Sequence, residues 1–261
     1  MTAPETDTTR ITDLLKTFKL PTVAEELVPR FHQGGQDDAL PHLLEVLELE
    51  AQDRRERRTI RLRRASKLPP GKTFDTLDET RFSRALVRKW RELAKGDFLE
   101  RAVNVLAFGL PGVGKSHVAC ALGHALIEAG HSVFFTPTYA LVQHLQSAKR
   151  ELELPRVLRK LDHFELLILD DIGYTRQSAD DAEVLFTLMA ERYERRSLMI
   201  TSNLTFSKWD RIFQSEMTTA AAIDRLVHHS VVLEFDVESY RGETARKKNA
   251  RKRPAAKAAK R

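Results

Sequence analysis

Apolar residues beyond position 100 follow two alternating patterns, short continuous runs and longer stretches with apolar residues three or four positions apart. The continuous runs have the length of strands and occupy residues 103–108, 132–136, 166–169, 197–203 and 229–235. Such runs are typical of strands buried on both faces, as in a parallel sheet. The stretches between them predict helices. The sequence therefore predicts an α/β fold with a central parallel sheet flanked by helices.

The N-terminal quarter of the chain shows helical spacing. Its apolar positions predict two short helices interrupted around Pro21 and a longer helix from Leu40 to Lys67. The first ten residues are Thr-rich and are predicted to be disordered. Leu68-Pro-Pro-Gly-Lys72 ends the long helix, because proline and glycine interrupt helical structure. We therefore divide the chain into a small all-helical region at residues 1–68, an α/β domain at residues 69–240 and a tail at residues 241–261.

The net charge of +6 is concentrated in two segments. The tail has ten Lys and Arg and one Glu, so it carries +9, and the remaining residues sum to −3. The predicted long helix has eight basic residues and one acid between Arg54 and Lys67. Positive charges concentrated in one segment repel one another unless an anionic partner neutralises them. We therefore predict a DNA tether in the tail and DNA contacts from Arg54, Arg55, Arg57, Arg58 and Arg61. The alternatives are a solubilising tail and a solvated helix face.

Composition argues against several other classes of protein. The single cysteine, Cys120, excludes a disulfide framework and a site with several thiolate ligands. No apolar run approaches the roughly 20 residues of a membrane-spanning helix. The polar, acidic N-terminus does not resemble a signal peptide or a transit peptide. We therefore expect a cytoplasmic protein without a membrane partner.

The strongest chemical signal is Gly109-Leu-Pro-Gly-Val-Gly-Lys-Ser116, which fits the phosphate-binding pattern G-x-x-x-x-G-K-[ST]. A predicted strand precedes it and a predicted helix follows, so the helix N-terminus would face the phosphates. The glycines let backbone N–H groups converge on phosphate oxygens, and Lys115 would reach the β- and γ-phosphates. We assign nucleotide contacts to Gly109, Leu110, Pro111, Gly112, Val113, Gly114, Lys115, Ser116 and His117. His117 is expected to pack or hydrogen-bond near the loop rather than to act as a base.

Two neighbouring carboxylates, Asp170 and Asp171, follow the apolar run at residues 166–169. Ligands of open α/β sheets bind at the carboxyl ends of the strands. Asp170 is expected to hold Mg²⁺ together with Ser116, and Asp171 is expected to orient or polarise the attacking water. Asn203 ends the next strand and would face the γ-phosphate or that water. The alternatives are a solvated loop or helix cap for the acids and an ordinary turn for Asn203.

Arg225 is the candidate arginine finger, a guanidinium that reaches the triphosphate of a neighbouring subunit. The alternative is a surface arginine paired with Asp224 or Asp181. The predicted catalytic residues are thus Lys115, Asp171, Asn203 and Arg225. His228 and His229 enter the last predicted strand, so they are expected to point to opposite faces and not to chelate a metal together.

Several motifs together resemble the IstB-like ATP-binding family of AAA+ proteins, relatives of the DnaC helicase loaders. The resemblance covers about residues 11–241 and rests on Arg64-Ala-Ser-Lys-Leu-Pro-Pro70, Lys72-Thr-Phe74, Asn104–His117, Leu166–Tyr174, Arg192-Tyr-Glu-Arg195, Thr201-Ser-Asn-Leu204, Thr218-Thr-Ala-Ala221, Asp224–His229 and Ser239-Tyr-Arg241. The sequence departs from the family pattern in three places. Asp171 stands where many relatives carry Glu, Phe213-Gln-Ser-Glu216 replaces a Gly-Asp pairing, and the basic tail is longer.

The resemblance implies an AAA+ P-loop fold and an ATPase that uses ATP and Mg²⁺. Members near IstB help a transposase encoded by the same insertion sequence, which implies a homo-oligomer with ATP at its subunit interfaces. The oligomer would assemble on duplex DNA, remodel it and deliver it to the cognate transposase, and hydrolysis would control disassembly. One alternative is a DnaC-like loader that binds a hexameric helicase and single-stranded DNA. Another is a nucleotide-gated DNA-binding module with little turnover.

Overall fold

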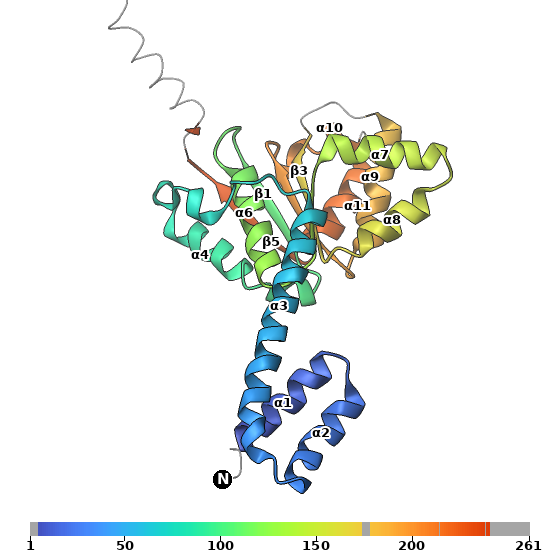
Figure 1. Cartoon of the computed structure of the whole chain (residues 1–261). Helices are drawn as coiled ribbons and strands as arrows, with labels where there is room; N and C mark the ends of the chain where they lie inside the picture. The colour runs from blue at the N-terminus through green and yellow to red at the C-terminus, as the bar shows by residue number, and fades with distance from the viewer. Residues whose placement is uncertain (1–4, 174–177, 214, 238, 241–261) are drawn as a thin grey trace, which may run out of the picture. The chain divides into compact units, whose positions relative to one another are not determined.

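The computed structural model describes residues 5–173, 178–213, 215–237 and 239–240 (Figure 1). The chain forms two compact units, Met1–Arg61 and Leu62–Arg261, which divide inside one long helix. The predicted tail at 241–261, with its proposed DNA tether, lies outside the described residues. Within the described part of the chain, no helix is both long enough and apolar enough to cross a membrane.

The N-terminal unit is helical. It contains α1 Glu5–Thr17, α2 Pro21–Gln33, a 3₁₀ turn at Asp37–Ala39 and most of α3 Leu40–Ser66. Pro21 begins α2, a position where its missing N–H leaves no helical hydrogen bond unmade. The predicted interruption around Pro21 is therefore confirmed. The predicted disorder is wrong for residues 5–10, because Ile11 and Leu15 are buried with Ala24 and Leu40 and stabilise the whole of α1.

The second unit begins with the end of α3 and a run of short elements before the first strand. They are η2 Phe74–Thr76, η3 Glu79–Arg81, α4 Arg84–Leu93 and α5 Asp97–Glu100. Trp90 of α4 is fully buried, with the Phe82 ring edge-on to it and the Phe235 ring stacked on it. Because Phe235 belongs to the last strand, these rings hold the segment before the first strand against the sheet.

Five parallel strands of the described chain form one sheet in the order β2-β3-β4-β1-β5. They are β1 Asn104–Gly109, β2 Val133–Pro137, β3 Leu166–Ile172, β4 Ser197–Ser202 and β5 Ser230–Phe235. Each apolar run of the sequence therefore forms a strand. Parallel strands have all their carboxyl ends at one edge, and the order places β4 between β1 and β3. The segments that leave β1, β3 and β4 are consequently neighbours.

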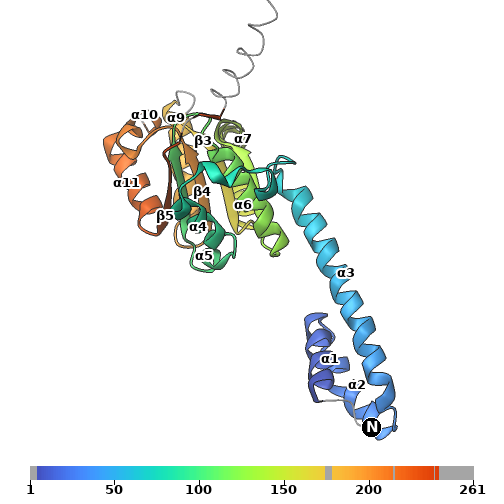
Figure 2. The same cartoon turned by 90° about the vertical axis from the view of Figure 1, so that its left-hand side faces the viewer.

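Helices cover both faces of the sheet (Figure 1, Figure 2). On one face, α4 and α6 Lys115–Glu128 pack on strand residues such as Val105 and Ile168. On the other, the core around Leu106 and Leu167 is covered by α7 Thr138–Arg150, α8 Leu154–Asp162, α9 Ala179–Arg192, α10 Asp210–Phe213 and α11 Glu216–Val227, with η4 Phe206–Lys208 before α10. Successive strand residues thus face two different cores. This confirms the α/β fold with a central parallel sheet and flanking helices.

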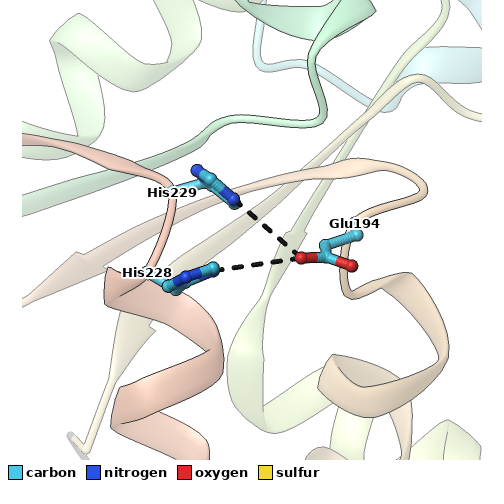
Figure 3. A group of neighbouring side chains, drawn as sticks. All are labelled: Glu194, His228 and His229. Atoms are coloured by element: carbon cyan, nitrogen blue, oxygen red, sulfur yellow. Dashed lines mark ion pairs between the residues drawn. The ribbon is translucent and has the colours of Figure 1, made fainter.

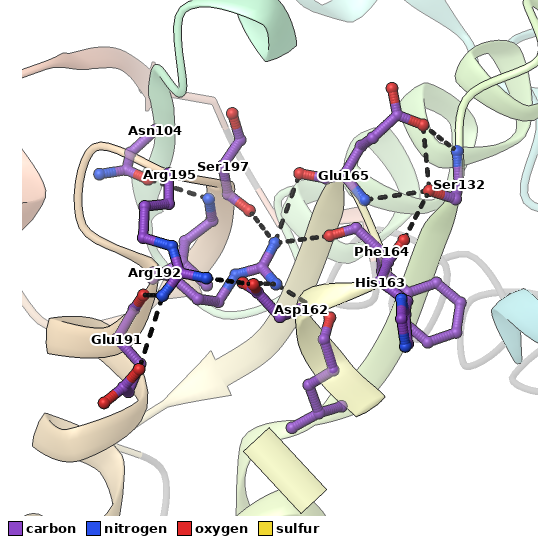
Figure 4. A network of polar contacts seen from close by, with 12 residues as sticks. Asn104, Ser132, Asp162, His163, Phe164, Glu165, Glu191, Arg192, Arg195 and Ser197 are labelled. Atoms are coloured by element: carbon purple, nitrogen blue, oxygen red, sulfur yellow. Dashed lines mark hydrogen bonds and ion pairs between the residues drawn. The ribbon is translucent and has the colours of Figure 1, made fainter. Parts of the chain in front are cut away.

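A buried arginine connects the amino ends of two strands on the second face (Figure 4). Arg192, the last residue of α9, is 2% exposed. Its guanidinium donates at 2.9–3.3 Å to the backbone carbonyls of Leu161, Phe164, Glu165 and Ser197. Burial lowers its pKa to about 10, and the neighbouring Asp162 carboxylate opposes this shift. Arg192 therefore fixes the starts of β3 and β4 relative to α9 and to the turn that follows it.

Candidate active site

The loop between β1 and α6 requires glycine at two positions where the backbone approaches other groups closely. Gly109 ends β1 with a φ of +156°, and a Cβ there would lie 2.6 Å from the Phe235 carbonyl oxygen. Gly114 precedes α6 with a φ of +104°, and a Cβ there would lie 3.2 Å from the Phe82 ring. Among the described residues no side chain caps the start of α6. The N-terminus of this helix therefore offers its first N–H groups to an anion in the loop.

Lys115 is 6% exposed, and its ammonium group donates to three oxygens around the loop. The acceptors are the carbonyls of Gly109 at 2.8 Å and Leu110 at 2.9 Å and the side-chain Oδ1 of Asn203 at 2.6 Å. A buried ammonium group requires such oxygen partners. The positive charge consequently lies at the loop itself, where phosphate oxygens of a nucleotide can replace these acceptors.

Asp170 and Asp171 lie at the carboxyl end of β3, and a hydroxyl group of β4 connects them. Thr201 Oγ1 donates to Asp170 Oδ1 at 2.7 Å and accepts from the Asp171 N–H at 2.8 Å. The register between β3 and β4 shifts at this point, and Asp171 has a φ of +62°. Asn203 Nδ2 in turn donates to Asp171 Oδ1 at 2.8 Å. Asn203 therefore connects the loop lysine to the second acid.

A cavity of about 470 Å³ opens at this edge of the sheet. It falls in the range of about 300–1,000 Å³ that is usual for small-molecule sites. Most of the residues predicted to bind nucleotide or to act in catalysis line it, namely Pro111, Gly112, Val113, Gly114, Lys115, Ser116, His117, Asp171 and Asn203. Gly109 and Leu110 contribute carbonyl oxygens to Lys115, and the Leu110 side chain is 70% exposed.

The donors present suit Mg²⁺ as well as a triphosphate. Ser116 lines the cavity with a hydroxyl group, and Asp170, near the carboxyl end of β3, offers a carboxylate held by Thr201. Mg²⁺ takes oxygen ligands, usually one or two from the protein together with water and phosphate oxygens. The assignment of Ser116 and Asp170 to Mg²⁺ stays a prediction with which this donor set agrees.

Sequence reasoning missed the opposite wall of the cavity. It is formed by the segment before β1 and by the end of the described chain, through Lys72, Thr76, Leu77, Asp78, Arg81, Phe82 and Tyr240. The Tyr240 N–H donates to the Gly112 carbonyl at 3.0 Å, and the Arg81 guanidinium lies 5.0 Å from the Tyr240 ring centroid. The motif Ser239-Tyr-Arg241 was the one available signal for Tyr240, and Arg241 lies outside the described residues.

His117 also joins this wall to the loop. Its Nε2 lies 3.0 Å from the Thr73 carbonyl oxygen and 3.1 Å from Thr76 Oγ1. The ring nitrogen is thus engaged with the segment before β1, in agreement with the expectation that His117 hydrogen-bonds near the loop. This contact ties the start of α6 to η2.

Comparison with known proteins identifies the family. The profile of the IstB-like ATP binding proteins matches residues 13–249. This chain belongs to that family. A relative from Sinorhizobium fredii, named as an insertion sequence ATP-binding protein, is 43% identical over 96% of this chain and 85% of its own length. A protein of Pseudomonas aeruginosa, named for the insertion sequence IS21 and for ATP binding, is 43% identical over 72% of this chain and 70% of its own length.

Solved structures share the fold of this IstB-like chain at low sequence identity. DnaI superposes with a TM-score of 0.53 at 17% identity, over 67% of this chain and 94% of the DnaI chain. AMPPCP-bound DnaA from Aquifex aeolicus superposes with a TM-score of 0.53 at 17% identity, over 66% of this chain and 52% of the DnaA chain. These neighbours confirm the predicted fold, a central parallel sheet flanked by helices.

Arg225 lies in the last turn of α11 and does not line the cavity of its own chain. Its Nη1 donates to the Ala221 carbonyl at 3.0 Å, and its guanidinium lies 5.0 Å from the Phe186 ring centroid. Asp181, one alternative partner, instead binds Ser178 in the cap of α9. The structure therefore brings Lys115, Asp171 and Asn203 together and leaves Arg225 apart from them.

The five arginines predicted to contact DNA are exposed on α3. Two of them already have acidic partners on the same helix. Arg54 pairs with Glu50 at 2.5 Å, and Arg57 pairs with Glu50 at 3.4 Å and Asp53 at 3.6 Å. These pairs neutralise part of the positive charge that the sequence indicates for this helix.

The expectation that His228 and His229 point to opposite faces is wrong (Figure 3). Alternation between faces applies only within a strand, and β5 begins at Ser230. His228 instead follows α11 with helical backbone angles, and both imidazoles face Glu194. The structure therefore brings together two imidazoles that were expected to point apart, and it places Glu194 beside them.

Proposed function

We propose that this IstB-like chain hydrolyses ATP in the cavity at the carboxyl ends of β1, β3 and β4. The observation that carries the proposal is the connected set of hydrogen bonds from Lys115 through Asn203 to Asp171. A phosphate-binding loop alone accounts for nucleotide binding. A carboxylate held beside the loop lysine adds a group that can orient and polarise water at the γ-phosphate.

Each group at this edge has a separate role in the proposed reaction. Lys115 binds the β- and γ-phosphates, and the N-terminus of α6 orients them. Asp171 accepts a hydrogen bond from the attacking water, and Asn203 keeps that carboxylate in place. Mg²⁺, held by Ser116 and Asp170, would neutralise charge on the β- and γ-oxygens.

Arg225 is proposed to act on the nucleotide of a neighbouring subunit. It lies next to Leu226, whose carbonyl oxygen accepts from Asn104 Nδ2 at the amino end of β1. The loop follows the carboxyl end of β1, about 17 Å away for a strand of this length. Arg225 is therefore at the opposite edge of the sheet from the nucleotide-binding loop of its own chain. In a homo-oligomer with ATP at its interfaces, Arg225 would instead reach the nucleotide of a neighbouring subunit.

Steady-state ATP hydrolysis by Asp171→Asn tests the catalytic assignment. We expect a loss of at least about a hundredfold in turnover with ATP affinity retained, because general-base groups contribute about 10²–10⁴. Asp180→Asn, which removes an exposed acid from the first turn of α9, is the matched control. Turnover by Asp171→Asn equal to that of the control would remove Asp171 from the mechanism.

A subunit-mixing experiment tests the assignment of Arg225. Lys115→Ala and Arg225→Ala proteins should each be inactive alone. Mixed, they should regain activity, since an interface with Lys115 from one subunit and Arg225 from another is intact. Absence of any recovery, with both variants shown to co-assemble, would contradict action in trans.

We also propose that ATP controls assembly on duplex DNA, which the chain remodels and delivers to a transposase in the cytoplasm. The names of the relatives, which place them in insertion sequences, support the transposase context. The basic tail and the exposed arginines of α3 support DNA as the anionic partner. Both relatives favour this function over a helicase loader.

The salt dependence of DNA binding tests this second part. Removing residues 242–261 should weaken binding to duplex DNA and reduce the slope of log affinity against log salt, because fewer phosphates are neutralised. Arg55→Gln with Arg61→Gln should do the same to a smaller extent. Arg156→Gln, an exposed arginine of α8 paired with Glu153, is the control. An unchanged slope in both variants would exclude these segments as DNA contacts.

A further inference from the structure

Glu194, His228 and His229 form a cluster of metal-ligand side chains outside the cavity (Figure 3). Each of these described residues offers one possible ligand atom, and the three atoms all lie within 4.8 Å of one another. His228 Nδ1 and His229 Nε2 are each 3.9 Å from the same atom, Glu194 Oε1. Imidazole nitrogen and carboxylate oxygen are ligands that Zn²⁺ and related ions bind readily.

The spacing of these atoms is close to that of a tetrahedral metal site. Zn²⁺ binds nitrogen and oxygen at about 2.0–2.2 Å, which separates tetrahedral ligand atoms by about 3.3–3.6 Å. The two imidazole–carboxylate separations of 3.9 Å are only slightly longer. All three side chains are more than half exposed, so a small inward movement meets no packed core. Three ligands on an open surface leave a fourth position for water.

The backbone holds the three residues at fixed positions. Glu194 follows the end of α9, where Arg192 binds four carbonyl groups, and its φ of +56° turns the chain there. On the other side, the His228 N–H donates to the Asp224 carbonyl at 3.0 Å, which continues α11. His229 lies between this helix end and β5. Closure around an ion therefore requires movement of side chains alone.

The geometry points to a surface site for a divalent transition-metal ion, Zn²⁺ or one of similar preference, bound by Glu194, His228 and His229. The site is distinct from that proposed for Mg²⁺, whose donors are a hydroxyl and a carboxylate. Imidazole ligands favour Zn²⁺, Ni²⁺ and Cu²⁺ over Mg²⁺. The two sites should consequently be separable by the choice of metal.

Tyr193 provides an additional test of the site, because its hydroxyl group competes with a metal ion for one of the ligand atoms. Its hydroxyl lies 3.1 Å from His228 Nδ1, the same nitrogen that faces Glu194. One imidazole nitrogen cannot accept a hydrogen bond from the tyrosine hydroxyl and bind a metal with the same lone pair. Removal of the hydroxyl should therefore leave metal affinity unchanged or increase it.

Calorimetric titration of the full chain with ZnCl₂ tests the site. The chain must carry no polyhistidine tag, and excess Mg²⁺ is included to occupy oxygen-only sites. We expect one Zn²⁺ per chain, with affinity reduced at least about tenfold in Glu194→Gln and in His229→Ala, as for losses within a metal site. His32→Ala, which removes an exposed histidine beside Asp37 in the N-terminal unit, is the matched control. Tyr193→Phe should bind at least as tightly as wild type.

Co²⁺ provides an independent reading of the geometry, because four-coordinate Co²⁺ absorbs visible light far more strongly than the aqueous ion. The bands should appear with one equivalent of Co²⁺, disappear on addition of Zn²⁺ and be absent in His229→Ala. Zinc binding that is the same in Glu194→Gln, His229→Ala and His32→Ala would overturn the inference. Loss of binding in Tyr193→Phe would overturn the assignment of three ligands.

Discussion

The ammonium group of Lys115 lies 2.6 Å from the side-chain oxygen of Asn203, which connects the loop after β1 to the segment after β4. The amide nitrogen of Asn203 faces the other way, to Asp171 at 2.8 Å. One side chain thus accepts from the residue proposed to bind phosphate and donates to the residue proposed to position water. A movement of Asn203 toward Lys115 or toward Asp171 therefore changes the hydrogen bond that it makes to the other residue.

Asn203→Ala should therefore affect turnover more than ATP affinity. Lys115 keeps its two carbonyl partners, whereas Asp171 loses the amide donor. We expect turnover to fall at least about tenfold, the effect of losing one positioning hydrogen bond to a charged group. Steady-state hydrolysis and fluorescent-nucleotide binding measure the two quantities. A larger loss in affinity than in turnover would contradict the role given to Asn203.

Thr201→Val should raise the concentration of Mg²⁺ required for ATP hydrolysis. Valine keeps the shape of threonine but neither donates to Asp170 nor accepts from the Asp171 N–H. A lost hydrogen bond to a charged group costs about 1.5–3 kcal/mol, so both acids become less well placed. Hydrolysis titrated with Mg²⁺ is the measurement. Thr205→Val, an exposed threonine that bonds to Ser207, should behave as wild type.

Arg192→Met should strongly destabilise the chain. The variant leaves the carbonyl groups of Leu161 and Ser197 without their donor, and both of these hydrogen bonds are buried. Removing one partner of a buried ionic network costs about 3–5 kcal/mol, which lowers the melting temperature by about 10 °C. Calorimetric melting of Arg195→Met provides the comparison, because this exposed arginine pairs with Asp162 at the surface. Equal melting temperatures for the two variants would show that the buried contacts contribute little.

Cys120 should report on unfolding through its reaction with thiol reagents. Burial raises the pKa of this thiol to about 12, so it stays protonated in the folded chain at pH 8. Unfolding returns the pKa to about 8.5 and exposes the sulfur, which restores reactivity. We expect labelling by a disulfide reagent to be slow in buffer and complete within minutes in denaturant. Fast labelling of the folded chain would contradict the buried position of Cys120 on α6.

The strands and the loop could be predicted because their signals are local. Continuous apolar runs produced all the strands, and the spacing of Gly109, Lys115 and Ser116 placed the loop between a strand and a helix. The order of the strands, which brings Asn203 beside Asp171, was not predicted from the sequence. No local pattern encodes which strand lies between two others.

The residues that the sequence did not reveal depend on contacts distant along the chain. Thr201 is an ordinary strand residue by its pattern, and its role appears only when β3 lies beside β4. Phe82 reaches the cavity because Trp90 packs against the last strand. The error at His228 and His229 arose because the predicted strand included His229, whereas β5 begins at Ser230, so neither histidine lies in a strand and the alternation of faces does not apply to them.

Because Asp171 has a φ of +62°, only some substitutions there change the side-chain chemistry without straining the backbone. Apart from glycine, asparagine and aspartate enter this left-handed conformation most readily. Asparagine therefore preserves the backbone and removes only the negative charge, whereas alanine or glutamate would add conformational strain to any chemical effect. Aspartate is thus the acid that the local backbone accepts with less strain than glutamate.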